Sequence, residues 1–199
     1  MKIVLASNNR GKLVELQAMF APLGVELIRQ GDLFEGEAPE PYGTFVENAL
    51  SKARFAAEKT GLPAIADDAG MCVDHFGGLP GVDTAYYCTQ FGYEKSDVNN
   101  VRALLEQMQG VENRRAAMVS TLVGVRSPKD PEPLIAVGRV QALLTTERRG
   151  SNGFGFDPVL LIPELGMTFA EMTPELKHAH SHRGRSSRAM IEMVKERWL

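Results

Sequence analysis

Asp67 and Asp68 stand side by side at the end of the apolar run 62–66, just before Gly70. Asp is depleted within strands and two adjacent carboxylates repel each other, so a pair placed where a buried strand ends favours a bound cation or proton. The alternative is a plain turn, because Asp-Asp-Ala-Gly has ordinary turn chemistry. Taken alone, the pair favours the turn, and other parts of the chain have to decide between the two.

Ser7 to Lys12 form a polar segment between the apolar run 3–6 and a stretch with apolar residues at helical spacing. Backbone N–H groups at a helix N-terminus attract anions, and Lys12 adds a positive charge. The segment is not a Walker loop, which has two glycines and Gly-Lys-Ser/Thr at fixed spacing. It indicates either an anion site or an ordinary polar loop between a strand and a helix.

Acidic residues offer ligands for a hard cation, because Mg²⁺ takes carboxylate oxygens together with substrate phosphates. Besides the Asp-Asp pair, these are Glu40 in a long loop and Glu47 in a helix. Glu47 stands three residues after Thr44, which is the pattern of a capping box, and capping is its first role. No group of His and Cys has the spacing of a zinc site.

Two further segments suit a nucleotide. Residues 177–188 concentrate seven cationic or titratable side chains, namely Lys177, His178, His180, His182, Arg183, Arg185 and Arg188. The alternative for this segment is a solvated charged helix, which fits Arg185 and Arg188 better than it fits the residues before Gly184.

The loop 153–157 reads Gly-Phe-Gly-Phe-Asp. Its glycines permit close approach of a ligand, Phe154 can stack on a flat base, and Asp157 can accept hydrogen bonds from a base edge or a sugar. The alternative is a glycine turn with two core phenylalanines, and Phe156 is expected in the core under either interpretation. Together, the polar loop, the carboxylates, the basic segment and this loop describe a nucleoside polyphosphate site with Mg²⁺.

The composition bounds the class of protein. A chain of 199 residues, 44% hydrophobic and 24% charged, is expected to be one domain or two small lobes around one core. A net charge of −3 argues against a nucleic-acid polymer or an anionic membrane as the main partner. The two cysteines are expected to be reduced thiols of a cytoplasmic protein, and no run has the length of a signal peptide or a membrane span.

Spacing and turn signals predict the elements that must position these residues. Strands are expected over 3–6, 25–28, 65–67, 71–74, 116–125, 133–144 and 159–162, and helices over 13–20, 44–59, 96–109, from 173 onward and over about 185–197. The Asp-Asp pair then lies in a turn between two short strands, and 181–184 lies between two helices. This order predicts an α/β fold with a mixed sheet surrounded by helices.

Six motifs occur in sequence order and span nearly the whole chain. They are Ser7-Asn8-Asn9-x-Gly-Lys12, Thr44-Phe45-x-Glu47-Asn48-Ala49-x-x-Lys52-Ala53, Ala66-Asp67-Asp68-x-Gly70, Gly78-x-Pro80-Gly81, Gly153-Phe154-Gly155-Phe156-Asp157-Pro158 and Ser181-His182-Arg183-Gly184. In this order the chain resembles the inosine triphosphate pyrophosphatase family, and six ordered motifs are far more specific than any single one.

The resemblance implies hydrolysis of ITP, dITP and XTP to the monophosphate and pyrophosphate with Mg²⁺. It also implies one domain over 1–199, made of an elongated mixed sheet in two lobes with a central cleft, and a homodimer. Carried over by position, Glu40 and Asp68 hold Mg²⁺ and Asp68 is the proton acceptor. The residues implied to bind the nucleotide are Ser7, Asn8, Asn9, Arg10, Gly11, Lys12, Lys52, Ala69, Phe154, Gly155, Phe156, Asp157, Lys177, His182 and Arg183.

The chain departs from the family pattern at two places. Ala69 follows the Asp-Asp pair where the family usually has Ser, so a contact there has to come from the backbone. Tyr86 stands where the family often has Arg, which removes a cation from that position. Neighbouring strand residues point to opposite faces, so the two aspartates are not expected to share one metal as equals. The resemblance places Asp68 at the metal and the water, and Asp67 is expected to be a structural carboxylate that holds the turn and pairs with a lysine such as Lys52.

Two rival functions remain at this point. One is a pyrophosphatase of another nucleotide, such as the Maf-type enzymes that act on dTTP or UTP, although these lack a Ser-His-Arg-Gly segment of this kind. The other is a nucleotide-binding module without catalysis, which would not need a costly acidic group beside phosphates. A small nucleoside triphosphate is the expected ligand in all three cases.

Overall fold

The computed structural model describes residues 1–199 apart from the side chain of Glu15. Its strands form one seven-stranded sheet in the order β2-β1-β3-β4-β5-β6-β7. Their bounds are β1 (Lys2–Leu5), β2 (Glu26–Arg29), β3 (Ala64–Val73), β4 (Arg115–Val125), β5 (Leu134–Leu144), β6 (Leu160–Ile162) and β7 (Met167–Thr168). Strand β1 runs parallel to β2 and β3, whereas β6 runs antiparallel to β5 and β7. The mixed α/β sheet predicted from the sequence is therefore confirmed.

Helices connect the strands, together with 3₁₀ segments, of which Gly81–Phe91 is the longest. The helices are α1 (Arg10–Phe20), α2 (Phe45–Thr60), α3 (Asp97–Gln107), α4 (Pro174–His180) and α5 (His182–Arg197). The chain divides into two compact units: unit 1 comprises residues 1–68, 120–138 and 185–199, and unit 2 comprises residues 69–119 and 139–184. No helix in the described chain combines the length and apolar character needed to span a membrane.

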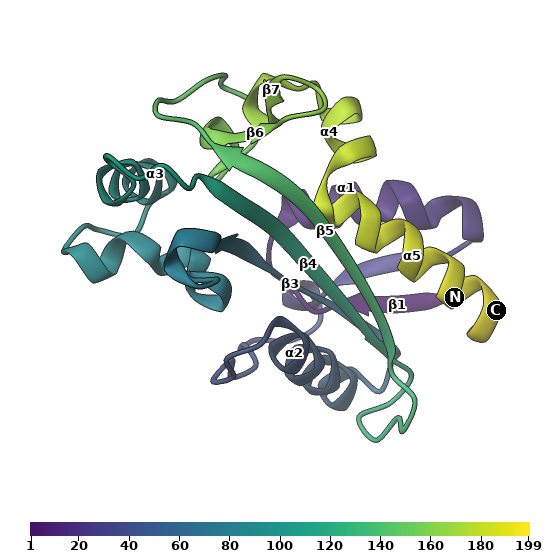
Figure 1. Ribbon diagram of the computed structural model, residues 1–199. Coiled ribbons are helices and arrows are strands. Elements are labelled where there is room, and N and C mark those ends of the chain that lie inside the picture. Colours follow the sequence, from purple (N-terminus) through teal and green to yellow (C-terminus); the bar gives the residue numbers. More distant parts are fainter. The chain divides into compact units, whose positions relative to one another are not determined.

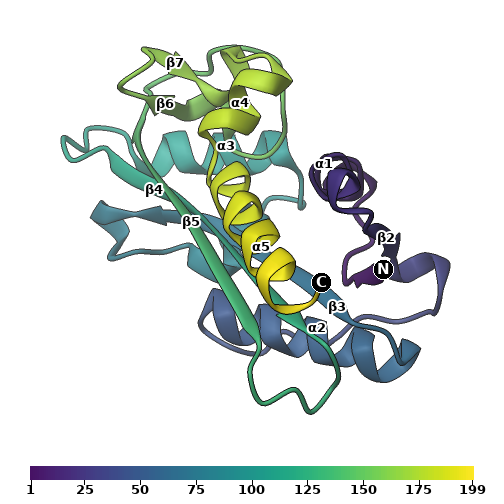
Figure 2. The same cartoon turned by 90° about the vertical axis from the view of Figure 1, so that its right-hand side faces the viewer.

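Unit 1 is a layered α/β body in which neighbouring strand residues face opposite sides of the sheet. Ile3 and Leu5 pack in an apolar cluster with residues of α1 and α5, whereas Val4 and Ala6 pack with the alanines of α2. Figure 1 shows α2 on one side of β1 and β3, and α1 and α5 on the other side. In Figures 1 and 2 the two chain termini, both in this unit, lie near each other.

The same alternation orders the first part of β3. Ile65 belongs to the cluster with α1 and α5, whereas Ala64 and Ala66 belong to the cluster with α2. Continued by one pleat, this alternation turns residue 67 toward α1 and α5 and residue 68 toward α2. Small alanines on both sides of the α2 contact allow this helix to lie close to the strand.

Unit 2 has its own core. Met71 and Val73 of β3 pack with Leu104 of α3 and with Phe156 and Phe169. Phe156 is buried as the sequence predicts, whereas Phe154, two residues earlier, is 49% exposed. The aromatic ring that is available to a ligand in the glycine-rich loop is therefore that of Phe154.

One prediction about the backbone is wrong. The sequence predicts a turn at Asp67 and Asp68, but β3 runs without interruption from Ala64 to Val73. The low strand propensity of Asp is outweighed here, because each carboxylate finds a lysine on its own face of the sheet. The pair therefore belongs to the interior of a strand.

Two helix starts also differ from the prediction. Helix α1 begins at Arg10, because Asn9 caps it by accepting the N–H of Lys12 at 3.1 Å. Helix α5 begins at His182, because the Ser181 hydroxyl accepts the N–H of Gly184 at 3.0 Å. Gly184 is thus the third residue of a helix and not a break, and its cap bond explains why a poor helix former is tolerated there.

Helix α2 starts at the predicted residue. Thr44 Oγ1 accepts the N–H of Glu47 at 3.4 Å, and its hydroxyl donates to Glu47 Oε2 at 2.5 Å. The side chain of Glu47 thus bonds the Thr44 hydroxyl, whereas a standard capping box uses the backbone N–H of the cap residue. Because Lys52 belongs to this helix, the residue at which the helix starts determines where Lys52 lies along the helix axis.

We expect Thr44→Ala to lower the free energy of unfolding by about 1 kcal/mol, because α2 loses its N-cap. Thr44→Ser keeps the hydroxyl and is expected to retain most of this stability. Urea unfolding of the wild type and the two variants measures the difference. Equal midpoints for the Ala and Ser variants would contradict the cap.

Candidate active site

Asp68 lies on the α2 side of β3, where it meets a lysine and a second carboxylate. Lys52 Nζ lies 3.1 Å from Asp68 Oδ1 and 3.1 Å from Glu40 Oε2. The side chains of Lys52 and Asp68 are only 13% and 12% exposed. The ammonium group therefore bridges two carboxylates at a poorly solvated place, and these are the two carboxylates that the resemblance assigns to one cation.

Burial and charge act against each other in this group. Burial raises the pKa of Asp68, and Lys52 only partly offsets this. For Lys52, burial acts to lower the pKa, but Asp68 and Glu40 outweigh it and raise the pKa above its usual value. Asp68 Oδ2 is buried without a hydrogen-bond partner among the described atoms. This oxygen is in position to take a proton or a cation.

Asp67 lies on the opposite side of β3. Its Oδ2 is 2.8 Å from Lys12 Nζ, and its side chain is 0% exposed. The hydroxyl of Ser120 donates to its Oδ1 at 2.8 Å. The sequence suggested Lys52 as the lysine partner of Asp67, and this is wrong: Lys52 pairs with Asp68, and Lys12 of α1 pairs with Asp67.

A pocket of about 170 Å³ in unit 1 collects several of the predicted residues. Ser7, Asn8, Lys12, Glu40, Lys52 and Asp67 are part of its lining. Asn9, Arg10 and Gly11 are not part of the lining and instead form the cap and first turn of α1. Sequence reasoning missed Glu37, which also lines the pocket and accepts a hydrogen bond from Asn8 Nδ2 at 3.1 Å. Its loop position carried no spacing signal.

The charges of this pocket decide what it can bind. Two lysines face four carboxylates, since Glu37, Glu40 and the Asp-Asp pair all stand at or beside the pocket. A polyphosphate alone would be repelled by the excess of negative charge, whereas a polyphosphate with a divalent cation would not. Among the described side chains, no group of three or more His, Cys, Asp or Glu is placed to hold a metal ion. The oxygen that Asp68 leaves without a hydrogen-bond partner, together with Glu40, fits a hard divalent cation whose remaining ligands are phosphates and water.

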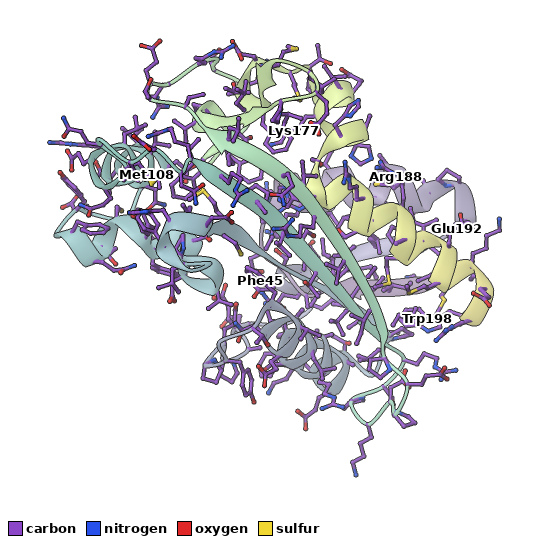
Figure 3. All side chains as sticks on the ribbon, in the orientation of Figure 1. Phe45, Met108, Lys177, Arg188, Glu192 and Trp198 are labelled. Atoms are coloured by element: carbon purple, nitrogen blue, oxygen red, sulfur yellow. The ribbon has the colours of Figure 1, made fainter. Side chains whose placement is uncertain are left out.

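Unit 2 gathers a second group of predicted residues around the ring of Phe154. Asp157 Oδ2 accepts the N–H of Phe154 at 2.9 Å and lies 2.5 Å from Lys177 Nζ. The same lysine lies 4.5 Å from the ring centroid of Phe154, and Arg183 Cζ lies 5.7 Å from it. Figure 3 shows Lys177 on α4. An exposed aromatic ring flanked by two cations has the chemistry to stack on a flat group and to donate hydrogen bonds to its oxygens.

Burial also shapes this second group. It raises the pKa of Asp157, although Lys177 opposes the effect. His182 is buried, with its ring centroid 6.2 Å from that of Phe169. Phe156 is 4% exposed and lies in the core, so only its backbone is available to a ligand. Ala69 is half-buried within β3.

Sequence reasoning also missed Asp97, the first residue of α3. Its Oδ2 accepts the N–H of Gly155 at 2.8 Å. This bond joins the glycine-rich loop to α3, 58 residues earlier in the chain. Asp97 follows the capping residue Ser96, so its sequence signal is that of an ordinary helix start.

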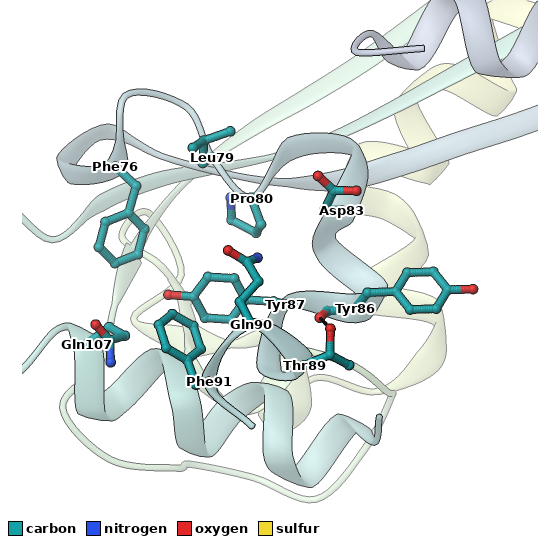
Figure 4. Close-up of a pocket in the computed structure, with 10 residues that line it drawn as sticks. All are labelled: Phe76, Leu79, Pro80, Asp83, Tyr86, Tyr87, Thr89, Gln90, Phe91 and Gln107. Carbon is teal, nitrogen blue, oxygen red and sulfur yellow. Dashed lines mark hydrogen bonds between the residues drawn. The ribbon is translucent and has the colours of Figure 1, made fainter. Parts of the chain in front are cut away.

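A larger pocket of about 420 Å³, also in unit 2, has a different character (Figure 4). Phe76, Tyr87 and Phe91 form its aromatic wall, and burial raises the pKa of Tyr87 to about 12. Its lining lacks a carboxylate paired with a cation, so it is less suited to phosphate chemistry than the smaller pocket. At its edge, Lys95 Nζ lies 3.8 Å from the ring centroid of Tyr86, which places a cation beside the residue that replaces Arg.

Fold and geometry together define an α/β protein with a mixed sheet and a pocket lined by paired carboxylates and lysines. A comparison with family models identifies the family. The chain belongs to the Ham1 family, whose family model matches residues 3–193. The family resemblance inferred from the six motifs is thereby confirmed.

Individual relatives match over the full length. The chain is 85% identical over 199 residues to the dITP/XTP pyrophosphatase of Delftia acidovorans, with all of both chains covered. It is 74% identical over 198 residues to the dITP/XTP pyrophosphatase of Paracidovorax citrulli, again with both chains covered in full. Among solved structures, a HAM1 protein from Coxiella burnetii matches with a TM-score of 0.93 and 36% identity, covering 98% of this chain and 99% of that one.

The glycine-rich loop gives a testable prediction. Gly153 has φ +76°, and a Cβ there would lie 1.9 Å from Asp157 Oδ2 and 3.2 Å from Lys177 Nζ. Gly153→Ala is therefore expected to separate Asp157 from Lys177 and to destabilise the protein. Gly155, at φ +61°, has nothing within 4 Å of such a Cβ, so Gly155→Ala adds backbone strain alone.

Thermal unfolding of the two glycine variants separates the effect of the collision at residue 153 from the effect of backbone strain alone at residue 155. Gly153→Ala should unfold at the lower temperature, with a difference equivalent to at least about 1 kcal/mol. Equal unfolding temperatures would show that Asp157 and Lys177 do not need the space that the glycine leaves.

Proposed function

We propose that this protein is a nucleoside triphosphate pyrophosphatase that converts dITP, ITP and XTP to the monophosphate and pyrophosphate, and so removes non-standard purines from the nucleotide pool. The observation that carries the proposal is the arrangement of Glu40, Lys52 and Asp68 beside the pocket that Lys12 lines. Relatives of the same length at 85% and 74% identity that carry the name dITP/XTP pyrophosphatase support it.

Mg²⁺ is the proposed cofactor, held by Glu40 and Asp68. The unpartnered Oδ2 of Asp68 and the negative balance of the pocket support this choice. When bound, such an ion neutralises phosphate charge and lowers the pKa of the water that it carries. The resemblance further implies a homodimer in the cytoplasm, and we include both in the proposal.

The chemistry assigned to unit 1 is attack of water on the α-phosphorus. The new bond joins the water oxygen to this phosphorus, and the bond from it to the α,β-bridging oxygen breaks, so that pyrophosphate leaves. Asp68 takes the proton of the water, and its raised pKa makes it a stronger base than an exposed aspartate. Lys12 and Lys52 offset the charge that develops on the leaving pyrophosphate.

The residues of unit 2 are proposed to bind the base. Hypoxanthine and xanthine present an oxygen at C6, which accepts hydrogen bonds, whereas adenine presents an amino group there. Lys177, His182 and Arg183 are donors, so adenine would meet donor against donor. A buried donor left unpaired costs about 1–3 kcal/mol, which disfavours ATP.

A panel of substrates tests the activity. Pyrophosphate release with Mg²⁺ is expected to be fastest for dITP, ITP and XTP, and slow for ATP, GTP and dTTP. Asp68→Asn is expected to keep nucleotide binding but to lose turnover by a factor on the order of 10² or more, because the proton acceptor is gone. A preference for dTTP would favour a Maf-type enzyme, and binding without turnover in the wild type would favour the non-catalytic module.

Base selection is tested separately at Arg183. Arg183→Ala is expected to reduce the ratio of ITP to ATP turnover about tenfold, because a donor near Phe154 is lost. Arg183→Lys keeps the charge but not the planar fork, so an intermediate ratio is expected. Inhibition by inorganic pyrophosphate should change little in either variant. An unchanged ITP to ATP ratio in Arg183→Ala would remove this residue from base recognition.

A further inference from the structure

Asp67 is the most deeply buried carboxylate of the candidate site. The proposed mechanism gives it no role. Its side chain is 0% exposed, and one of its oxygens is 2.8 Å from Lys12 Nζ. The other oxygen accepts the hydroxyl of Ser120 at 2.8 Å. Ser120 in turn lies 2.8 Å, hydroxyl to hydroxyl, from Ser186 of α5. A polar chain thus runs from α5 through β4 and β3 to α1.

Such a buried chain is costly to form. A carboxylate that is buried away from water loses its hydration, which costs several kcal/mol unless an opposite charge and hydrogen bonds compensate for the loss. Lys12 and Ser120 supply both replacements for Asp67, one at each oxygen. The result is a single fixed geometry, because each partner comes from a different element of unit 1.

Lys12 is the member of this chain that is open to a ligand. Its side chain is 20% exposed and lines the pocket of unit 1, and Lys12 is the third residue of α1, where its N–H is bound by the cap residue Asn9. A free lysine side chain samples many rotamers, and fixing it costs up to about 2 kcal/mol. An anion that meets an ammonium group already held in place does not have to bear that cost.

We propose that Asp67 is a positioning residue that fixes the ammonium group of Lys12 for the phosphates of the substrate, and that Ser120 holds Asp67 in place for this task. Asp67 itself touches neither substrate nor metal, because its oxygens are occupied and its side chain is buried. The two adjacent aspartates therefore act on different parts of the reaction: Asp68 on water and cation, Asp67 on phosphate binding through Lys12. The inference rests on the proposed pyrophosphatase function.

A double-mutant cycle in the full-length protein tests this assignment. The variants are Asp67→Asn, Lys12→Ala and the double variant, assayed for pyrophosphate release from dITP with Mg²⁺. Asp67→Asn removes the negative charge that holds the ammonium group of Lys12, so KM is expected to rise on the order of tenfold, with kcat changed less than about threefold. In the Lys12→Ala background, the same substitution is expected to change KM by less than about twofold.

Ser120→Ala and Asp130→Asn serve as matched variants. Ser120→Ala should raise KM in the same direction, but less than Asp67→Asn. Asp130 is another buried carboxylate of unit 1, bound to Arg126 in the connection after β4, and it does not contact Lys12. Asp130→Asn should lower stability and leave the KM for dITP unchanged.

The possible outcomes differ clearly. Independent, multiplicative effects of Asp67→Asn and Lys12→Ala on KM would overturn the assignment, as would a loss confined to kcat. If the wild type released no pyrophosphate from any nucleotide, the proposed function would fail. The four proteins of the cycle would then be compared by urea unfolding in Mg²⁺, with and without inorganic pyrophosphate. The coupling is supported if the double variant is as stable as Lys12→Ala and is stabilised by pyrophosphate to the same extent. It is overturned if the two substitutions lower the stability, and the stabilisation by pyrophosphate, additively.

Discussion

The alternation of side chains along β3 is the constraint on which the rest of the site depends. Successive residues of a strand point to opposite faces, so two neighbouring aspartates cannot share one environment. In unit 1 the face of Ile65 meets α1 and α5, and the face of Ala64 and Ala66 meets α2. Each aspartate therefore meets the lysine of a different helix, and this divides one acidic pair into two separate ion pairs.

Burial is what gives those ion pairs their chemical character. Both oxygens of Asp67 have protein partners, Lys12 of α1 and Ser120 of β4, so its carboxylate is held in one orientation. Asp68 keeps one oxygen without a partner, and burial raises its pKa. The two adjacent aspartates thus differ because both oxygens of Asp67 have partners, whereas one oxygen of Asp68 has none.

The sequence predicted the mixed sheet, the helices and the set of residues around Lys52 and Phe154, because these depend on periodicity and on motifs that are local in the chain. It did not predict that β3 continues through Asp67 and Asp68, since the lysines that stabilise the pair come from α1 and α2. Asp97 was missed for the same reason: its bond to Gly155 joins residues far apart in the chain. At Asp67 and Asp68, partners that are distant in the sequence outweighed the low strand propensity of aspartate.

In the pocket of unit 1, carboxylates outnumber lysines, and under the proposed function this excess bears on how a protein with net charge −3 would select a charged substrate. A pocket made only of cations would bind any polyphosphate and would hold the product pyrophosphate as well. A pocket whose lysines are already paired with carboxylates has little net attraction for an anion by itself. Under the proposed function, binding would require the anion and a divalent cation together, so the carboxylates that make the site costly to fold would also restrict it to the metal complex of a nucleotide.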